Sequence, residues 1–125
     1  MIDNGTGGEL RGALMVPKGI QFVQLDNTYK FYTKAQVLAA LKDIPLEKYV
    51  PESHDCDNFA QDAECHVAHE LPGCPFGFAR GKSKTGGAHA VNVFWASENG
   101  KVKRYYYDAT GYRMLDEFDV SFIMA

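Results

Sequence analysis

Hydrophobic residues recur at helical spacing in two segments of the chain. In the longer segment, small or apolar residues three and four positions apart form one stripe: Cys56, Ala60, Ala63, Val67 and Leu71. This spacing predicts an amphipathic helix that begins at Cys56 or Asp57, with Asp55 as its N-cap. A shorter helix is predicted from about residue 34 to residue 43, with Thr33 as its cap.

Runs rich in β-branched and aromatic residues predict strands elsewhere. The predicted strands cover residues 20–25, 29–32, 76–80, 88–96, 101–109 and 120–124. The dipeptide Asn99-Gly100 stands between two of these runs and is a strong β-hairpin signal. If these residues form a two-residue turn, Glu98 faces Lys101, whereas a four-residue loop would shift the pairing. The order of elements predicts the α+β fold class, with the longer helix packed on an antiparallel sheet.

Composition and charge narrow the range of functions. The chain has 125 residues, of which 46% are hydrophobic and 23% charged, so it fits one globular domain. We expect a mobile arm over residues 1–12, which contain several glycines, and a single domain over residues 13–125. The net charge of −3 gives no reason to expect nucleic acid or an anionic membrane as partner. No apolar run is long enough to span a bilayer.

The cysteines indicate the compartment. Cys56, Cys65 and Cys74 are odd in number and crowd into one region, unlike the distributed disulfide framework of a small secreted protein. The N-terminus also lacks a basic region followed by an apolar one. We therefore expect a reducing, cytoplasmic location, while the oligomeric state stays open.

Three residues are candidates for thiol chemistry. Cys56 stands at a predicted helix N-terminus, where the partial positive charge and free backbone N–H groups favour thiolate over thiol. Both possible hairpin registers place His89 and Asp108 on one face of the sheet, within side-chain reach. A cysteine nucleophile needs such a pair, because the imidazole transfers the proton and the carboxylate orients the ring.

The same residues lie in three short motifs that resemble a known family. These are Asp-Cys-Asp-x-Phe-Ala at 55–60, Gly-Gly-x-His-Ala-x-Asn at 86–92 and Tyr-Asp-Ala at 107–109. They resemble the papain-like and transglutaminase-like cysteine hydrolases, particularly the short phage and bacterial versions and the C-terminal domain of the fairy-ring mushroom agglutinin. The resemblance implies a papain-like fold and a peptidase, amidase or acyl transferase that needs no cofactor. It makes Cys56 the nucleophile, His89 the general base and Asp108 the orienting acid.

The chain departs from the papain pattern at the oxyanion hole. Residues 50–55 contain no glutamine upstream of the cysteine. The oxyanion donors would then be the Cys56 backbone N–H and a side chain, for which His54 and Asn92 are the candidates. The expected partner is a peptide or amide substrate, and peptide, isopeptide, peptidoglycan amide and acyl transfer all remain open.

Two alternatives belong to other functional classes. Four zinc-ligand types stand in close order: Cys65, His66, His69 and Cys74. A small zinc domain using Cys65, His69 and Cys74 is one alternative, but nine residues of ideal helix separate Cys65 from Cys56 and turn it to the opposite face. We therefore expect no metal in the catalytic site and no contribution of Cys65 or Cys74 to its chemistry. The other alternative is a catalytically silent binding or structural module on the same fold.

Overall fold

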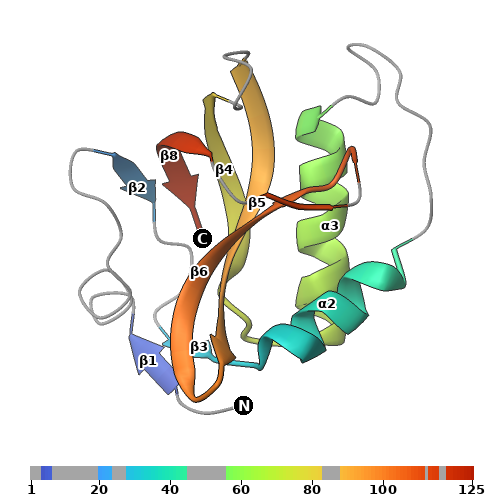
Figure 1. Ribbon diagram of the computed structural model, residues 1–125, viewed down its shortest axis with the longest axis vertical. Helices are drawn as coiled ribbons and strands as arrows, with labels where there is room; N and C mark the ends of the chain where they lie inside the picture. The colour runs from blue at the N-terminus through green and yellow to red at the C-terminus, as the bar shows by residue number, and fades with distance from the viewer. Residues whose placement is uncertain are drawn as a thin grey trace.

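Two helices pack against a mainly antiparallel sheet, so the chain has an α+β fold (Figure 1). The computed structural model describes residues 4–6, 20–23, 28–44, 56–82, 88–111, 113–115 and 118–125. The described helices are α2 (Lys34–Lys42) and α3 (Cys56–Glu70). The described strands are β1 (Asn4–Thr6), β2 (Gln21–Val23), β3 (Thr28–Lys30), β4 (Phe76–Lys82), β5 (Ala88–Glu98), β6 (Lys101–Asp108), β7 (Arg113–Leu115) and β8 (Asp119–Met124).

The main sheet has six strands in the order β2-β8-β4-β5-β6-β7. Its neighbouring strands run antiparallel except β2 and β8, which run parallel. A separate two-stranded sheet joins β1 to β3. The C-terminal strand β8 thus lies beside β4, far from it in the sequence, and this placement builds a surface that no local sequence pattern contains.

The hairpin between β5 and β6 has the two-residue turn. Glu98 pairs with Lys101, and the turn residues Asn99 and Gly100 have φ angles of 53° and 80°. Positive φ at both positions is the type I′ geometry that the twist of antiparallel strands favours. The observed register confirms the first of the two predicted pairings.

Helix α3 packs its predicted apolar stripe on the sheet. Ala60, Ala63 and Val67 are fully buried, and Phe59 is 4% exposed. Figure 1 shows α3 alongside one face of the central strands, with α2 crossing near its C-terminal end. The helix begins at Cys56, as the spacing predicts. Its stripe of small residues lets the helix pack closely against β4 and β5.

A second core cluster occupies the other face of the sheet. Alternation along β5 separates the clusters: Phe94 joins the core under α3, whereas Val93 and Trp95 join the second cluster. The second cluster also contains Tyr29, whose hydroxyl donates a 2.8 Å hydrogen bond to the Ala125 carbonyl. Both faces of the central strands are therefore buried.

The sequence-based elements agree with this structure in kind. The capping box of α2 forms between Thr33 and Gln36, as its predicted cap requires. Strands β1 and β7 were not predicted from the sequence, and β1 lies inside segment 1–12, whose remaining residues are outside the described part. Of the described helices, none is long and apolar enough to cross a membrane.

Candidate functional site

His89 and Asp108 lie in direct contact, as the hairpin register predicts. The His89 Nε2 atom lies 3.3 Å from Asp108 Oδ1, and the two side chains are 21% and 9% exposed. The same carboxylate oxygen accepts a 2.6 Å hydrogen bond from the Thr110 hydroxyl and a 3.1 Å bond from the Thr110 backbone N–H. We call His89, Asp108 and Thr110 the hairpin cluster.

The electrostatics of the hairpin cluster favour an ionised carboxylate. Burial alone would raise the pKa of Asp108, but the hydrogen bonds from Thr110 and the charge of His89 together lower it below its ordinary value. An ionised Asp108 can fix the orientation of the imidazole ring. The acid and base expected from the sequence are thus brought together.

Cys56 lies at the first residue of α3. Its side chain is half-buried and packs against the cluster of Ala60, Phe78 and Ala90. Among the described residues, no hydrogen bond or ion pair joins the Cys56 thiol to His89. The helix position of the thiol is confirmed, while the catalytic roles of Cys56, His89 and Asp108 stay predictions.

Asn92 is a structural link between helix and sheet. Its side chain is fully buried, and its amide nitrogen donates 2.9 Å hydrogen bonds to the carbonyls of Ala60 and Gly77. The amide N–H groups are therefore occupied and do not point at a reacting atom. The second oxyanion candidate, His54, lies outside the described residues.

The remaining cysteines do not form a metal centre in the described structure. Cys65 is exposed, whereas burial of Cys74 raises its pKa to about 12. The described residues contain no group of three or more His, Cys, Asp or Glu side chains that could hold a metal ion. This geometry does not favour the zinc alternative that uses Cys65, His69 and Cys74.

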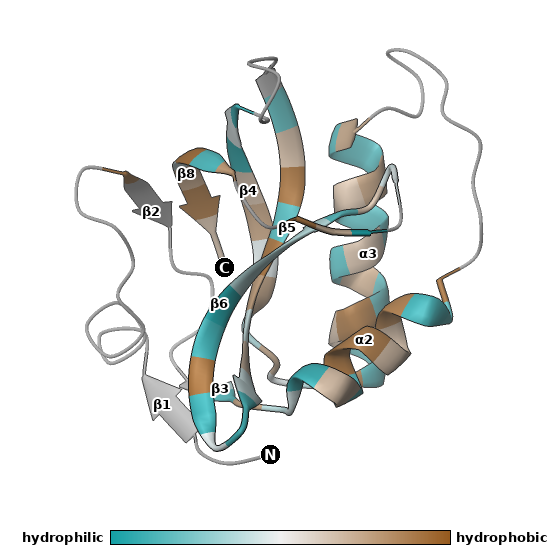
Figure 2. Cartoon of the chain, viewed as in Figure 1, coloured by the Kyte–Doolittle hydropathy of each residue, from teal (hydrophilic) through white to brown (hydrophobic). Residues whose placement is uncertain are grey.

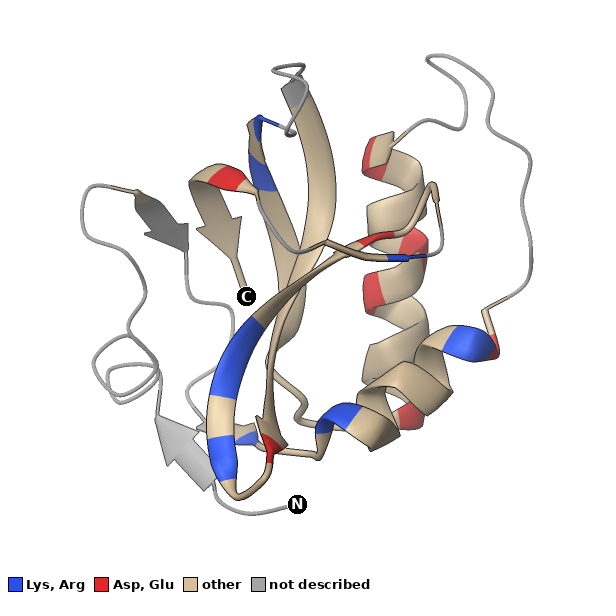
Figure 3. Cartoon of the chain, viewed as in Figure 1, with Lys and Arg blue, Asp and Glu red and all other residues tan. Residues whose placement is uncertain are grey.

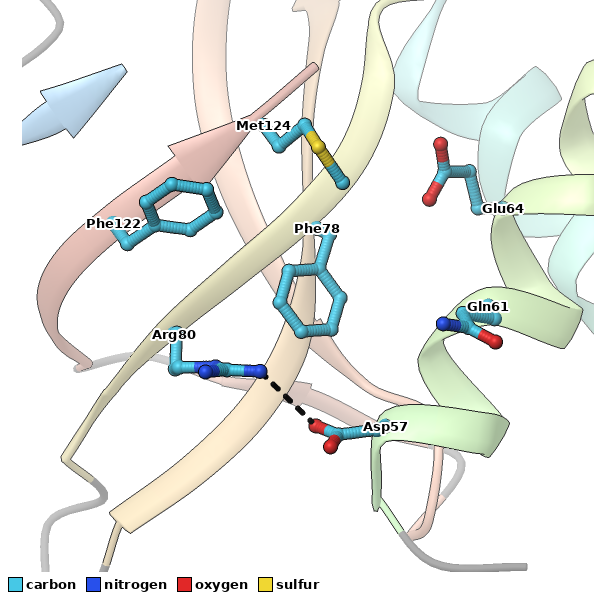
Figure 4. A pocket seen from close by; sticks show the side chains of 7 residues that line it. All are labelled: Asp57, Gln61, Glu64, Phe78, Arg80, Phe122 and Met124. Atoms are coloured by element: carbon cyan, nitrogen blue, oxygen red, sulfur yellow. Dashed lines mark ion pairs between the residues drawn. The ribbon is translucent and has the colours of Figure 1, made fainter. Parts of the chain in front are cut away.

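A pocket of about 500 Å³ opens between α3 and the strands β4 and β8 (Figure 4). Its lining residues define what we call the α3–β8 pocket: Asp57, Gln61, Glu64, Phe78, Arg80, Phe122 and Met124. The three residues from α3 are four and three positions apart, so they share one helix face. This volume is within the range of ligand sites in proteins.

Two cross-strand pairs form the opposite wall of the pocket. Phe78 of β4 pairs with Met124 of β8, and Arg80 pairs with Phe122 in the same ladder. Directly opposed residues place their side chains on one face of a sheet. Two aromatic rings and one guanidinium therefore face the polar side of α3, as Figure 4 shows.

The polar groups of the α3–β8 pocket are only weakly engaged with one another. The Arg80 and Asp57 side chains are 4.0 Å apart and are 61% and 49% exposed. Such an exposed ion pair has a small interaction energy and is easily exchanged for another partner. Burial raises the pKa of Glu64, which lies about two turns after Asp57 in α3.

Sequence reasoning missed this pocket. The spacing of Asp57, Gln61 and Glu64 indicates one polar helix face. This pattern does not single out a binding site, because exposed helix faces are usually polar. The opposite wall could not be predicted from the sequence. It forms because Phe122 and Met124 of β8 pair with Arg80 and Phe78 of β4, which are distant in the sequence.

Comparisons with known proteins support a fold but not a family. No family model and no curated protein matches the chain's sequence. One solved structure with a similar fold is the complex of PSL1a with E64, with a TM-score of 0.75, 18% identity and 98% of this chain covered. Another is the Polyporus squamosus lectin bound to the human-type influenza-binding epitope Neu5Acα2-6Galβ1-4GlcNAc, with a TM-score of 0.75, 20% identity and the same coverage. This chain spans about half of each, 51% and 49% of their lengths.

These findings correct the family and function inferred from the motifs. One of the similar structures is named as a Polyporus squamosus lectin with a bound glycan, so the assignment to papain-like or transglutaminase-like cysteine hydrolases, with a cysteine protease activity, is wrong. Only the comparison with a mushroom agglutinin agrees with them. The physical reason is that a thiol at a helix N-terminus and a His–Asp pair on a hairpin are local features, which different proteins can present.

The expected partner and the finer fold assignment change for the same reason. A peptide or amide substrate is contradicted, because the similar lectin structure holds a glycan epitope. The α+β class is confirmed, but its papain-like form is not. At this level of identity the likeness shows the fold alone.

Proposed function

We propose that the chain is a non-catalytic glycan-binding module and that the α3–β8 pocket is its binding site. The observation that carries this proposal is the composition of the pocket. Two aromatic rings, two carboxylates, an amide and a guanidinium line one open space of about 500 Å³. The hairpin cluster is not part of this proposal.

The pocket suits both sides of a sugar ring. A pyranose has an apolar C–H face, which can lie on Phe122, since the face of an aromatic ring is electron-rich. Its hydroxyl groups can donate to the carboxylates of Asp57 and Glu64 and accept from the amide of Gln61. Phe122 is half-buried and Gln61 is exposed, so both can reach a ligand.

Arg80 favours a sugar that carries a carboxylate. A guanidinium binds a carboxylate through two parallel N–H donors, which is stronger than a neutral hydrogen bond. Its present partner, Asp57, is 4.0 Å away and half exposed, so a ligand carboxylate can replace it. The epitope bound by the similar lectin ends in such an acidic sugar, Neu5Ac.

We also propose a cytoplasmic location for the protein. The three cysteines are free thiols, which agrees with the reducing cytoplasmic environment expected from their number and spacing. A glycan-binding module with this location would meet glycans of the same cell or of material taken into it.

The test is a titration of the protein with Neu5Acα2-6Galβ1-4GlcNAc and with Galβ1-4GlcNAc, followed by calorimetry. We expect saturable binding of the acidic glycan and binding of the neutral one that is at least about tenfold weaker, the size of one charge-assisted interaction. The variant Arg80→Gln should remove this difference, and Phe122→Ala should weaken both glycans.

Arg113→Gln is the matched control, because Arg113 is an exposed arginine outside the α3–β8 pocket. It should leave both affinities unchanged. The proposal fails if neither glycan binds, or if the Arg80 and Arg113 variants lose affinity equally.

A further inference from the structure

A second pocket lies outside the proposed glycan site. It measures about 290 Å³ and is formed by α2, the end of β6 and β7. Its lining residues define what we call the α2–β7 pocket: Leu38, Leu41, Lys42, Ile44, Tyr107, Arg113 and Met114. It shares no lining residue with the α3–β8 pocket.

The α2–β7 pocket has a buried apolar floor and an accessible apolar wall. Leu41 and Tyr107 are 3% and 5% exposed and belong to the core under α3. Leu38, Ile44 and Met114 pack against that core but are only partly buried. Figure 2 shows the hydrophobic segments of α2 beside α3. Apolar atoms therefore remain available to a ligand above a rigid floor.

The charged lining residues of this pocket are both cations. Lys42 is exposed in the last turn of α2, and Arg113 is exposed at the start of β7. Asp108 lies 3.9 Å from the Arg113 Nε atom, so the terminal guanidinium nitrogens remain for another anion. Figure 3 shows basic residues on both α2 and β7. No acidic side chain is among the residues that line the pocket.

We propose that the α2–β7 pocket binds an alkyl carboxylate, a molecule with an unbranched hydrocarbon chain and one terminal carboxylate. The chain lies on Leu38, Leu41 and Met114, and the carboxylate meets Lys42 and Arg113. Charge complementarity selects this ligand, because a neutral or cationic amphiphile would make no charge-assisted hydrogen bond with Lys42 or with the terminal guanidinium nitrogens of Arg113. The pocket volume, close to the lower limit for ligand sites, suits a chain of medium length.

The test titrates the full chain with sodium decanoate below its micelle concentration and follows heat and ligand NMR signals. We expect saturable binding at one site, and octanoate, which is two methylenes shorter, binding about fifteenfold more weakly, because each buried methylene changes affinity about fourfold. Decyltrimethylammonium, which has the same chain and the opposite charge, should not bind. Equal binding of the cation, or no saturable binding of decanoate, overturns the proposal.

Two sets of variants locate the site. Lys42→Glu combined with Arg113→Glu should weaken decanoate at least about tenfold, whereas Lys101→Glu with Lys103→Glu makes the same charge change on the hairpin and should not. Leu38→Trp should fill the pocket and abolish decanoate binding while the glycan affinity of the α3–β8 pocket is kept. Equal losses in the two charge variants would mean that the effect is only net charge and would overturn the proposal.

Discussion

The hairpin cluster and the α3–β8 pocket use similar polar groups in opposite ways. In the hairpin cluster, the Asp108 carboxylate is 9% exposed and is bonded to His89 and Thr110. In the pocket, the Arg80 and Asp57 side chains are 61% and 49% exposed, and their charged atoms lie 4.0 Å apart. One region satisfies its polar atoms internally, and the other leaves them to solvent.

This difference separates structural from binding roles. A largely buried network whose members bond one another leaves fewer donors and acceptors for a ligand. Exposed groups with weak partners lose little when a ligand replaces those partners. The comparison therefore favours the pocket as a binding surface and predicts that the two regions respond differently to substitution.

The largest effect is expected at Asn92, which connects the two regions. It lies on β5, the strand of His89, and holds α3 to β4 through the carbonyls of Ala60 and Gly77. Asn92→Leu would leave both buried carbonyls with one partner fewer and should lower the free energy of unfolding by about 3 kcal/mol. Urea denaturation measures this loss.

Ser121→Ala is the control for that experiment. Its hydroxyl donates one exposed hydrogen bond to the Arg80 carbonyl, so its loss should cost about 0.5 kcal/mol or less. If Asn92→Leu were no more destabilising than Ser121→Ala, Asn92 would not connect helix and sheet.

Local patterns predicted most of the fold. The stripe from Cys56 to Leu71 predicted α3, which ends at Glu70, and Asn99-Gly100 predicted the hairpin and hence the contact of His89 with Asp108. These features depend on neighbours a few residues apart or on one tight turn. The pairing of β8 with β4 and the parallel pairing of β2 with β8 depend on contacts between distant segments. Neither hydrophobic periodicity nor turn-forming residues specify such contacts.

The candidate site was less predictable than the fold. The sequence singled out residue types suited to catalysis, and the structure confirmed the His89–Asp108 pair but not a cysteine hydrolase. The α3–β8 pocket was missed because its walls come from α3, β4 and β8 together. Arg80 and Phe122 look ordinary in their own strands, and only their cross-strand pairing places them in one wall.

The alkylation rates of the three cysteines test whether Cys56 is unusually reactive. With iodoacetamide near neutral pH, we expect Cys65 to react first because it is exposed, then half-buried Cys56. Cys74 should react at least about tenfold more slowly than Cys65, since burial raises its pKa to about 12 and leaves little thiolate. Peptide mass spectrometry gives the three rates.

The order of these rates also tests the predicted catalytic residues. If Cys56 reacted before Cys65 at mildly acidic pH, and His89→Ala removed that preference in a folded protein, Cys56 and His89 would act together. The hairpin cluster would then be a chemical site, and the contrast with the pocket would fail.

Asp108→Asn should have a smaller effect, which depends on pH. The substituted amide would keep an acceptor for Thr110 but lose the charge opposite His89, at a cost of about 1 kcal/mol at neutral pH. The folded-state pKa of Asp108 lies below its ordinary value, so its ionisation stabilises the fold above the unfolded pKa and this contribution is lost as the pH falls. Unfolding curves of the two proteins should therefore converge towards acidic pH, and a constant difference would contradict the assignment.

The smallest effect is expected at Glu64, within the α3–β8 pocket. Burial raises its pKa, so it takes up a proton at a higher pH than an exposed glutamate does. As the pH falls through this raised pKa, the affinity for the acidic glycan should rise about twofold, because Glu64 loses a charge that repels the ligand carboxylate. Glu64→Gln should bind with the higher affinity throughout and lose most of this pH dependence. The neutral glycan is the control, since it has no carboxylate to be repelled, and an equal rise in its affinity would place the titrating group elsewhere.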